Sequence, residues 1–104
     1  MEQIIQIEWA AAHLEEARKI CKGLVEQKLV ACAQIIPHME SIYFWKDHIE
    51  SSLEVKVFLK TTESRYFQVE AMILQLSSYE VPEIIKSNVD GFDSYLKWIC
   101  EVVN

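Results

Sequence analysis

The chain has 104 residues, of which 51% are hydrophobic and 25% are charged, a size and composition typical of one globular domain. Ten Lys and Arg against sixteen Asp and Glu give a net charge of −6, which argues against nucleic acid and anionic membranes as partners because both require clustered cations. No apolar run approaches the roughly 18 residues of a membrane span, and Glu2 followed by no apolar segment predicts that there is no signal peptide.

The three cysteines, Cys21, Cys32 and Cys100, are odd in number and show no CxxC spacing. Such a set does not form a disulfide framework. We expect buried free thiols, with Cys21 and Cys100 in helices and Cys32 in a strand. Free thiols are typical of a reducing compartment, so we expect a cytoplasmic protein.

Apolar periodicity predicts the elements of the first half of the chain. Alternation from Ile5 to Trp9 predicts a half-buried strand. Apolar residues at three- and four-residue spacing then predict a helix from about Ala12 to Lys28. A second strand is expected from Leu29 to Ile36 and again from Glu40 to Trp45. Pro37 interrupts it, because proline has no N–H to donate and marks an edge or a bulge.

The second half of the chain continues the alternation of strands and helices. The polar segment from Lys46 to Ser52 is predicted to be a turn, and it leads into a third strand from Leu53 to Lys60. A helix from Glu63 to Leu76, a strand from Glu83 to Ser87 and a helix from Phe92 to Val103 are expected to follow. The side chains expected to be buried are Tyr66, Val69, Ile73 and Leu76 of the second helix and Phe92, Tyr95, Leu96 and Ile99 of the third.

The resulting order is β-α-β-β-α-β with an added C-terminal helix, in a single domain over residues 1–104. It predicts the ferredoxin-like α+β fold, with an antiparallel sheet that the first two helices cover on one face. The other face then needs shelter from elsewhere. This is one reason to expect an oligomer.

A long β-hairpin over residues 31–61 gives a second reason. Each of its strands should have about 13 to 15 residues, which at roughly 3.3 Å per residue is on the order of 45 Å. A domain of about 100 residues has a radius of gyration near 13 Å. The hairpin should therefore extend beyond its own core, and its apolar and aromatic side chains should be covered by another copy of the chain.

Several short segments resemble the CutA divalent-cation-tolerance family in matching order and spacing. They are Leu29-Val30-Ala31-Cys32, Ile35-Ile36-Pro37, Ser41-Ile42-Tyr43-Phe44-Trp45, Leu59-Lys60-Thr61, Tyr79-Glu80-Val81-Pro82-Glu83-Ile84-Ile85 and Tyr95-Leu96-Lys97-Trp98. The resemblance implies a ferredoxin-like subunit and a tight cytoplasmic homotrimer built through the long hairpin, similar in architecture to the PII signalling trimers. It also implies binding of a divalent cation, copper above all, with Zn²⁺ or another ion as alternatives.

The chain departs from the pattern of this family at several positions. His38 and Asp47 stand where the family commonly has glycine. Because glycine adopts positive φ freely, the two replacements predict a changed local backbone, although Asp tolerates such conformations better than most residues. Ser77 and Ser78, after Leu76, replace a His-Pro pair, and Trp9 stands where some members have a thiol. Of the thiol, imidazole and carboxylate set proposed for the family, Glu83 alone matches.

Four residues are candidate metal ligands: His38, His48, Glu80 and Glu83. The two histidines lie ten residues apart, without the spacing of a dedicated metal motif. They are either surface histidines or parts of a site that a threefold axis assembles. The two glutamates flank Pro82 and offer oxygen, which Mg²⁺ and Ca²⁺ prefer, whereas copper prefers imidazole or thiolate. The alternative role of Glu83 is to accept hydrogen bonds from a neighbouring chain.

Aromatic residues and one lysine are candidates for a cleft between subunits. The aromatic ones are Tyr43, Phe44, Trp45, Tyr79 and Trp98. They would either line a small-molecule cleft or anchor the subunit interface, and the two roles are compatible. Lys60 would either meet an anion in the same cleft or simply face solvent.

Catalytic motifs are scarce in the chain. No Ser or Cys stands at a motif spacing from a histidine, the two glycines form no phosphate loop, and HExxH does not occur. We therefore expect a protein that is not an enzyme. The leading hypothesis is a homotrimer linked to divalent-metal tolerance through ion binding. The alternatives are a PII-like signalling module that binds a small anion or metabolite between subunits, and an assembly platform without a ligand.

Overall fold

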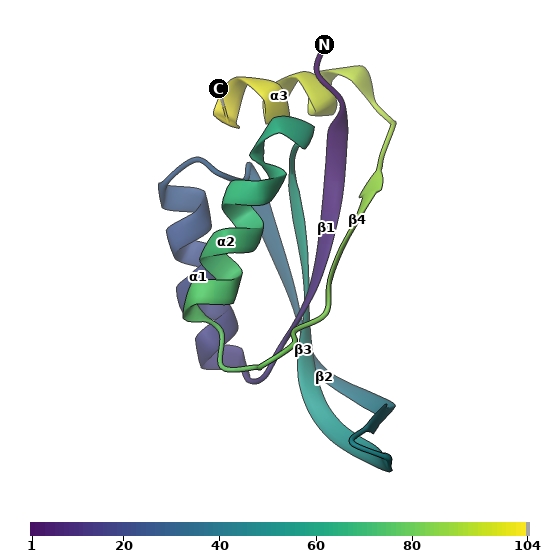
Figure 1. The fold of residues 1–104 in the computed structure, drawn as a ribbon. Helices are drawn as coiled ribbons and strands as arrows, with labels where there is room; N and C mark the ends of the chain where they lie inside the picture. Colours follow the sequence, from purple (N-terminus) through teal and green to yellow (C-terminus); the bar gives the residue numbers. More distant parts are fainter. Residues whose placement is uncertain (104) are drawn as a thin grey trace.

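The structure is a computed structural model that describes residues 1–103 as a four-stranded sheet with three helices (Figure 1). Its elements are β1 (Ile4–Ala11), α1 (Leu14–Glu26), β2 (Cys32–Trp45), β3 (His48–Thr62), a 3-10 helix (Glu63–Arg65), α2 (Tyr66–Leu76), β4 (Ile84–Asn88) and α3 (Asp93–Val103). The strands are antiparallel in the order β2-β3-β1-β4. This confirms the predicted α+β fold with its ferredoxin-like order of elements.

The main core lies between the sheet and helices α1 and α2. Alternation along β1 and β3 turns every second side chain toward these helices, and each helix presents an apolar stripe in return. The buried cluster includes Ile5, Ile7 and Trp9 of β1, Val57 and Leu59 of β3, Ala17, Ile20 and Leu24 of α1, and Val69 and Ile73 of α2. A second cluster beside α3 contains Ile4, Ala31, Leu96, Ile99 and Val103. The core thus forms from the residues that the periodicity selects.

Three residues expected to be buried in the helices are exposed. Leu76 is the last residue of α2 and points away from the core. Phe92 precedes α3 and is 77% exposed. Tyr95 of α3 is exposed as well, and its ring packs on Trp98 with 5.7 Å between the ring centres. All three lie at a helix end or beside the apolar stripe by which the helix packs on the rest of the molecule. Their positions fit the three- and four-residue periodicity, but their side chains do not reach the core.

The three cysteines are free thiols, but only Cys21 is buried. Burial raises the pKa of the Cys21 thiol to about 11, so this residue stays protonated and unreactive at neutral pH. Cys32 and Cys100 are half-buried, which corrects the expectation that all three lie in the core. The Sγ atom of Cys32 on the edge strand β2 lies 3.5 Å from the Tyr95 hydroxyl of α3.

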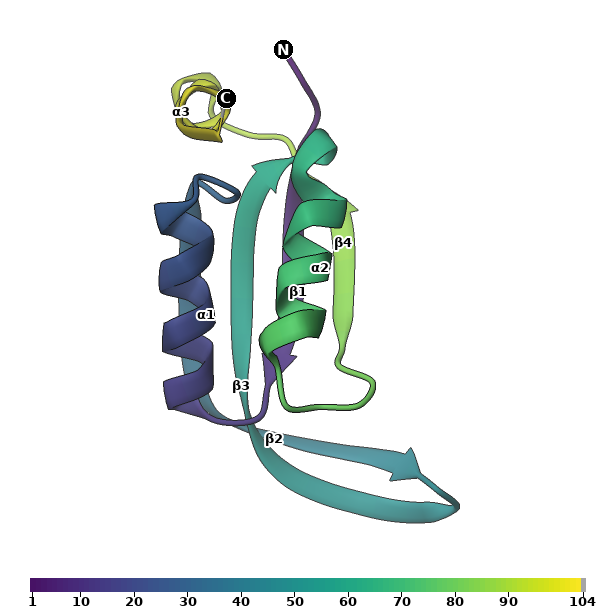
Figure 2. The same ribbon diagram turned by 60° about the vertical axis from the view of Figure 1, so that its left-hand side comes forward.

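The hairpin of β2 and β3 extends well beyond the body of the molecule (Figure 2). Its strands have 14 and 15 residues and pair continuously to the tip. Residues 39–54, here called the arm, pair only with each other because β1 has no partners beyond Val55. The longest dimension of the molecule is consequently 45 Å against 24 and 22 Å for the others. The predicted projection is confirmed.

A β-bulge connects the arm to the sheet. The register of β2 against β3 shifts between Ile36 and Met39, so that Pro37 and His38 together face one residue of β3. Pro37 thus marks a bulge within one continuous strand. A bulge was one of the two predicted explanations for this proline, the other being a strand edge. His38 has a φ of 65°, so this histidine keeps a conformation that favours glycine. The expected change of backbone at this position is wrong.

The tip of the arm is a two-residue turn. Trp45 pairs directly with His48, and Lys46 and Asp47 between them have φ values of 51° and 68°. Positive φ at both central residues is the pattern of a type I′ turn, which suits the twist of a hairpin. The predicted turn from Lys46 to Ser52 is therefore too long, because its residues from His48 onward belong to β3 and pair with β2. Their polar character reflects a ribbon that is open to solvent on both faces. Asp47 also keeps the positive φ that was expected to change.

Replacing Lys46 with Asn and Asp47 with Gly is expected to stabilise the protein by about 1 kcal/mol. Asn and Gly adopt positive φ at lower steric cost than Lys and Asp, so the substitutions relieve strain at the tip. For a domain of this size the gain raises the melting temperature by about 4–8 °C, measured by thermal unfolding at fixed protein concentration. The control is Asp47→Ala, which should lower the melting temperature. A variant that melts below the native protein would show that the tip is unstrained.

Candidate functional site

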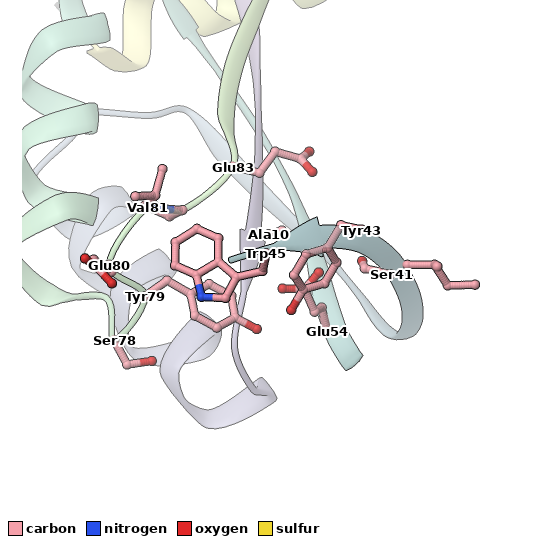
Figure 3. Close-up of a pocket in the computed structure, with 12 residues that line it drawn as sticks. Ala10, Ser41, Tyr43, Trp45, Glu54, Ser78, Tyr79, Glu80, Val81 and Glu83 are labelled. Atoms are coloured by element: carbon pink, nitrogen blue, oxygen red, sulfur yellow. The ribbon is translucent and has the colours of Figure 1, made fainter. Parts of the chain in front are cut away.

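A cleft of about 720 Å³ lies between the arm and the loop that joins α2 to β4 (Figure 3). Its lining consists of Ala10 of β1, Ser41, Ile42, Tyr43 and Trp45 of β2, Glu54 of β3, and Ser78, Tyr79, Glu80, Val81, Pro82 and Glu83 of the loop. Alternation along β2 places Ser41, Tyr43 and Trp45 on one side of the strand. Two segments more than thirty residues apart in sequence therefore meet at one site.

The loop of the cleft is fixed at both ends. The Ser78 backbone N–H donates to Oε1 of Glu16 on α1 over 2.8 Å. The Ala10 N–H of β1 donates to the Glu83 carbonyl over 3.2 Å, so the loop joins the sheet just before β4 begins. Tyr79 and Glu80 lie between these attachments, and the Tyr79 ring points toward the arm (Figure 3). The loop thus presents its side chains from a held backbone.

An ion-pair network lies beside the cleft. Nζ of Lys56 is 2.6 Å from Oε2 of Glu83 and 3.5 Å from Oε1 of Glu8 on β1. Burial alone would lower the pKa of Lys56, but the hydrogen bond and charge of Glu83 and the charge of Glu8 raise it above its usual range. The lysine stays charged at neutral pH, and its charge is matched by two carboxylates.

The inner wall of the cleft joins a phenol to a carboxylate. Glu54 is only 9% exposed, although it carries a charge. Burial, together with the hydrogen bond and the charge of Glu54, raises the pKa of Tyr79 to about 12. Tyr79 therefore stays neutral and donates its hydroxyl hydrogen to Glu54. On the arm, the Tyr43 hydroxyl lies 3.2 Å from Oγ of Ser52.

Five of the candidate residues meet in this cleft: Tyr43, Trp45, Tyr79, Glu80 and Glu83. The three aromatic rings and the two carboxylates come from the arm and from the loop. The sequence singled out these residues one by one, and the structure brings them together.

The other aromatic and basic candidates lie elsewhere. Phe44 is on the opposite side of β2 and is 74% exposed. Lys60 pairs with Cys32 near the other end of β3, and its ammonium donates to the Gln34 side chain. Trp98 lies on α3, at the end of the molecule away from the arm (Figure 1). Lys60 therefore lies outside this cleft, with about half the length of β3 between it and the loop.

The two histidines are exposed at opposite ends of the arm. His38 lies in the bulge and His48 at the tip. Val55, opposite the bulge, is seven positions along β3 from His48, which is roughly 23 Å at 3.3 Å per residue. Within residues 1–103 of one protomer, no group of three or more His, Cys, Asp or Glu side chains is arranged to hold a metal ion.

The sequence patterns did not single out Glu54, which lines the cleft, or Lys56, which lies beside it. They occupy alternate positions of β3, on either side of the buried Val55, which places them on the face away from α1 and α2. The charge at these positions was visible in the sequence. The sequence did not show that Tyr79, Glu8 and Glu83 lie next to them. This proximity depends on the register of β1 against β3 and on the path of the loop.

The departures from the family pattern have structural explanations. Trp9 is fully buried in the main core, so its indole fills space that a ligand would need to leave open. Its Nε1 atom has no hydrogen-bond partner within residues 1–103. Ser77 ends α2 and is half-buried, and Ser78 lines the cleft. Neither serine replaces the imidazole chemistry of a histidine.

None of the helices formed by residues 1–103 has the length and apolar character needed to cross a membrane.

Comparisons with known proteins agree with this geometry. The model of the family described as "CutA1 divalent ion tolerance protein" matches residues 5–102. The divalent-cation tolerance protein CutA of Thermus thermophilus is 34% identical over 102 residues, which cover 97% of each chain. A CutA homolog of Xenopus laevis is 39% identical over 88 residues, and this match spans 84% of the present chain but 58% of the relative. The crystal structure of CutA1 from Shewanella sp. SIB1 superposes with a TM-score of 0.93 at 35% identity, over 97% of this chain and 95% of that one.

Proposed function

This chain belongs to the CutA1 divalent ion tolerance family, and from that premise we propose that it is a homotrimer that takes part in the response to divalent metal ions by binding them. The family match over nearly the whole chain carries this proposal. The relatives from Thermus thermophilus and other organisms are named for divalent-cation tolerance. The contacts of the arm and the cleft indicate how the chain would perform such a role.

The uncovered surfaces of the protomer support assembly. On the arm, Ile42, Phe44, Ile49 and Leu53 are all exposed. The outer edges of β2 and β4 have no partner strand among the described residues. Exposed apolar ribbons and free strand edges are liabilities that proteins cover by association. Three copies of the chain, joined through their arms, would cover both.

The metal would bind where carboxylates are already gathered. Glu80 and Glu83 lie in one cleft, and Glu80 makes no hydrogen bond or ion pair with the described residues. Two carboxylates are too few for copper or zinc, which favour imidazole and thiolate ligands. We propose that a second protomer completes the site and that the exposed His38 or His48 supplies the imidazole.

Calorimetric titration of the reduced protein with Cu²⁺ and Zn²⁺ tests this function. Saturable heat is expected from the native protein, and the double variant Glu80→Gln, Glu83→Gln should bind at least about tenfold more weakly, a loss of about 1.4 kcal/mol. His38→Ala with His48→Ala should weaken Cu²⁺ binding further. Glu26→Gln on α1 combined with Glu101→Gln on α3 removes the same two charges elsewhere and serves as the control. The absence of heat at high micromolar metal would rule out direct binding.

The role we propose is non-enzymatic and cytoplasmic. Free thiols at three positions suit a reducing compartment. A small anion, the ligand of the PII-like alternative, is disfavoured in this cleft because Glu54, Glu80 and Glu83 would repel it and Lys56 is already paired. The geometry therefore supports a cation in preference to an anion.

A further inference from the structure

The cleft offers three aromatic rings to a guest. Tyr43, Trp45 and Tyr79 all line it, and within residues 1–103 none of them is paired with another ring. Nζ of Lys46 lies 5.6 Å from the centre of the Trp45 ring, so this indole already attracts an ammonium group from its own chain. Electron-rich ring faces bind cations through their quadrupole, and Trp is the most effective of them.

The charges of the cleft favour the same kind of guest. Glu54, Glu80 and Glu83 contribute three carboxylates, and Lys56 beside them is held by Glu83 and Glu8. Glu54 lies deep in the wall with an exposure of 9%, so its charge acts in a medium of reduced dielectric constant. A carboxylate surplus in a partly enclosed cleft raises the local concentration of cations.

The size of the cleft distinguishes an organic cation from a metal ion. Its volume of about 720 Å³ falls in the range of roughly 300–1,000 Å³ typical of small-molecule sites. A metal ion occupies a small fraction of this space and needs converging ligands, which one protomer does not supply within residues 1–103. Aromatic faces are poor ligands for a hydrated metal ion but good ones for an alkylated ammonium group.

From these three observations we propose that the cleft between the arm and the loop of residues 78–83 binds an organic cation that carries an alkylated ammonium group. Tyr43, Trp45 and Tyr79 contact the alkyl groups, and Glu54 and Glu80 supply the countercharge. This site shares its cleft and Glu80 with the proposed metal site, but unlike that site it needs no residue from a second protomer. It adds a second class of ligand to the protein.

Choline and its uncharged isostere 3,3-dimethyl-1-butanol provide a direct test, because the two differ in charge and hardly in shape. Binding is followed by calorimetry and by Trp fluorescence, with EDTA present so that metal ions do not contribute. Choline should bind saturably in the millimolar range, and the isostere should bind at least about tenfold more weakly. Equal binding of the two compounds, or no saturable binding of choline, would overturn the proposal.

Variants assign the binding to the cleft. Tyr79→Leu and Glu54→Gln should each weaken choline binding by about tenfold while the mass of the assembly stays unchanged. Phe44→Leu is the matched control, since Phe44 lies on the same strand as Tyr43 but faces away from the cleft. If Phe44→Leu weakens choline binding, or if neither cleft variant weakens it, the cation binds elsewhere. Either result would contradict the proposal. Metal titrations on the same variants report separately on the proposed metal function.

Discussion

Replacing Trp9 with alanine is expected to lower the free energy of unfolding by about 3–5 kcal/mol, the range typical of large aromatic residues in cores. Trp9 is 0% exposed and lies on β1, where it pairs with Val57 of β3 and Ile84 of β4. Its removal leaves a cavity that the sheet and the two helices cannot close without moving. Because a domain of this size is stable by about 5–15 kcal/mol, the loss is a large share of the total.

Chemical unfolding followed by circular dichroism at fixed protein concentration measures this loss. Trp9→Phe should cost much less than alanine, since it removes an indole N–H that has no partner in the described structure and leaves a smaller cavity. Phe92→Ala serves as the surface control and should change stability by less than about 0.5 kcal/mol. An alanine variant as stable as the native protein would show that position 9 lies outside the core.

Removing the arm is expected to convert the protein into a monomer. In the variant, residues 40–53 are replaced by Asn-Gly, which closes the hairpin on the pair of Met39 and Glu54. The core clusters contain no residue of the deleted segment, so the body should still fold. The exposed apolar side chains of the arm disappear with it, and the proposed trimer loses the ribbon that joins its copies.

Light scattering measures the mass of this variant, and circular dichroism verifies that the body is folded. The full-length chain with Asn-Gly at positions 46 and 47 is the control, because it carries the same turn on an intact arm and should remain a trimer. A folded short-arm variant with the mass of three chains would show that assembly depends on the sheet face or the strand edges instead. Such a result would move the proposed interface away from the arm.

The body of the fold follows from the sequence because its pattern is enforced by burial. Along β3, the buried Val55, Val57 and Leu59 alternate with Lys56, Phe58 and Lys60, and a slip by one position would turn all three away from the core. The helix stripe of Ala17, Ile20 and Leu24 is equally unambiguous. Where one face must be buried, periodicity alone predicts the element and its orientation.

The arm could be predicted in length but not in detail. The segment from His48 to Ser52 has no apolar alternation, because neither face of the ribbon is buried in the protomer, and composition alone therefore suggests a turn. The positive φ values at His38 and Asp47 are also set by the hairpin, since the bulge and the two-residue tip fix the backbone whatever residue stands there. Local preference gives way to the pairing of the strands.

The candidate site, like the arm, could be predicted only in part. Tyr79, Glu80 and Glu83 were singled out from the sequence, since they fall in a segment that resembles the family. Their partners Glu54 and Lys56 were not, because contacts between distant segments depend on strand register and on where the loop is attached. Residue types were therefore predictable, whereas the charge balance of the cleft became visible only in three dimensions.

Native mass spectrometry of the reduced protein, with and without Zn²⁺, tests the assembly and the metal site together. The predicted result is one species with three times the 12.2 kDa mass of the chain, which binds Zn²⁺ and loses it when Glu80 and Glu83 are replaced by Gln. A species with the mass of a single chain that acquires no Zn²⁺ would contradict both the homotrimer and its role in binding divalent ions.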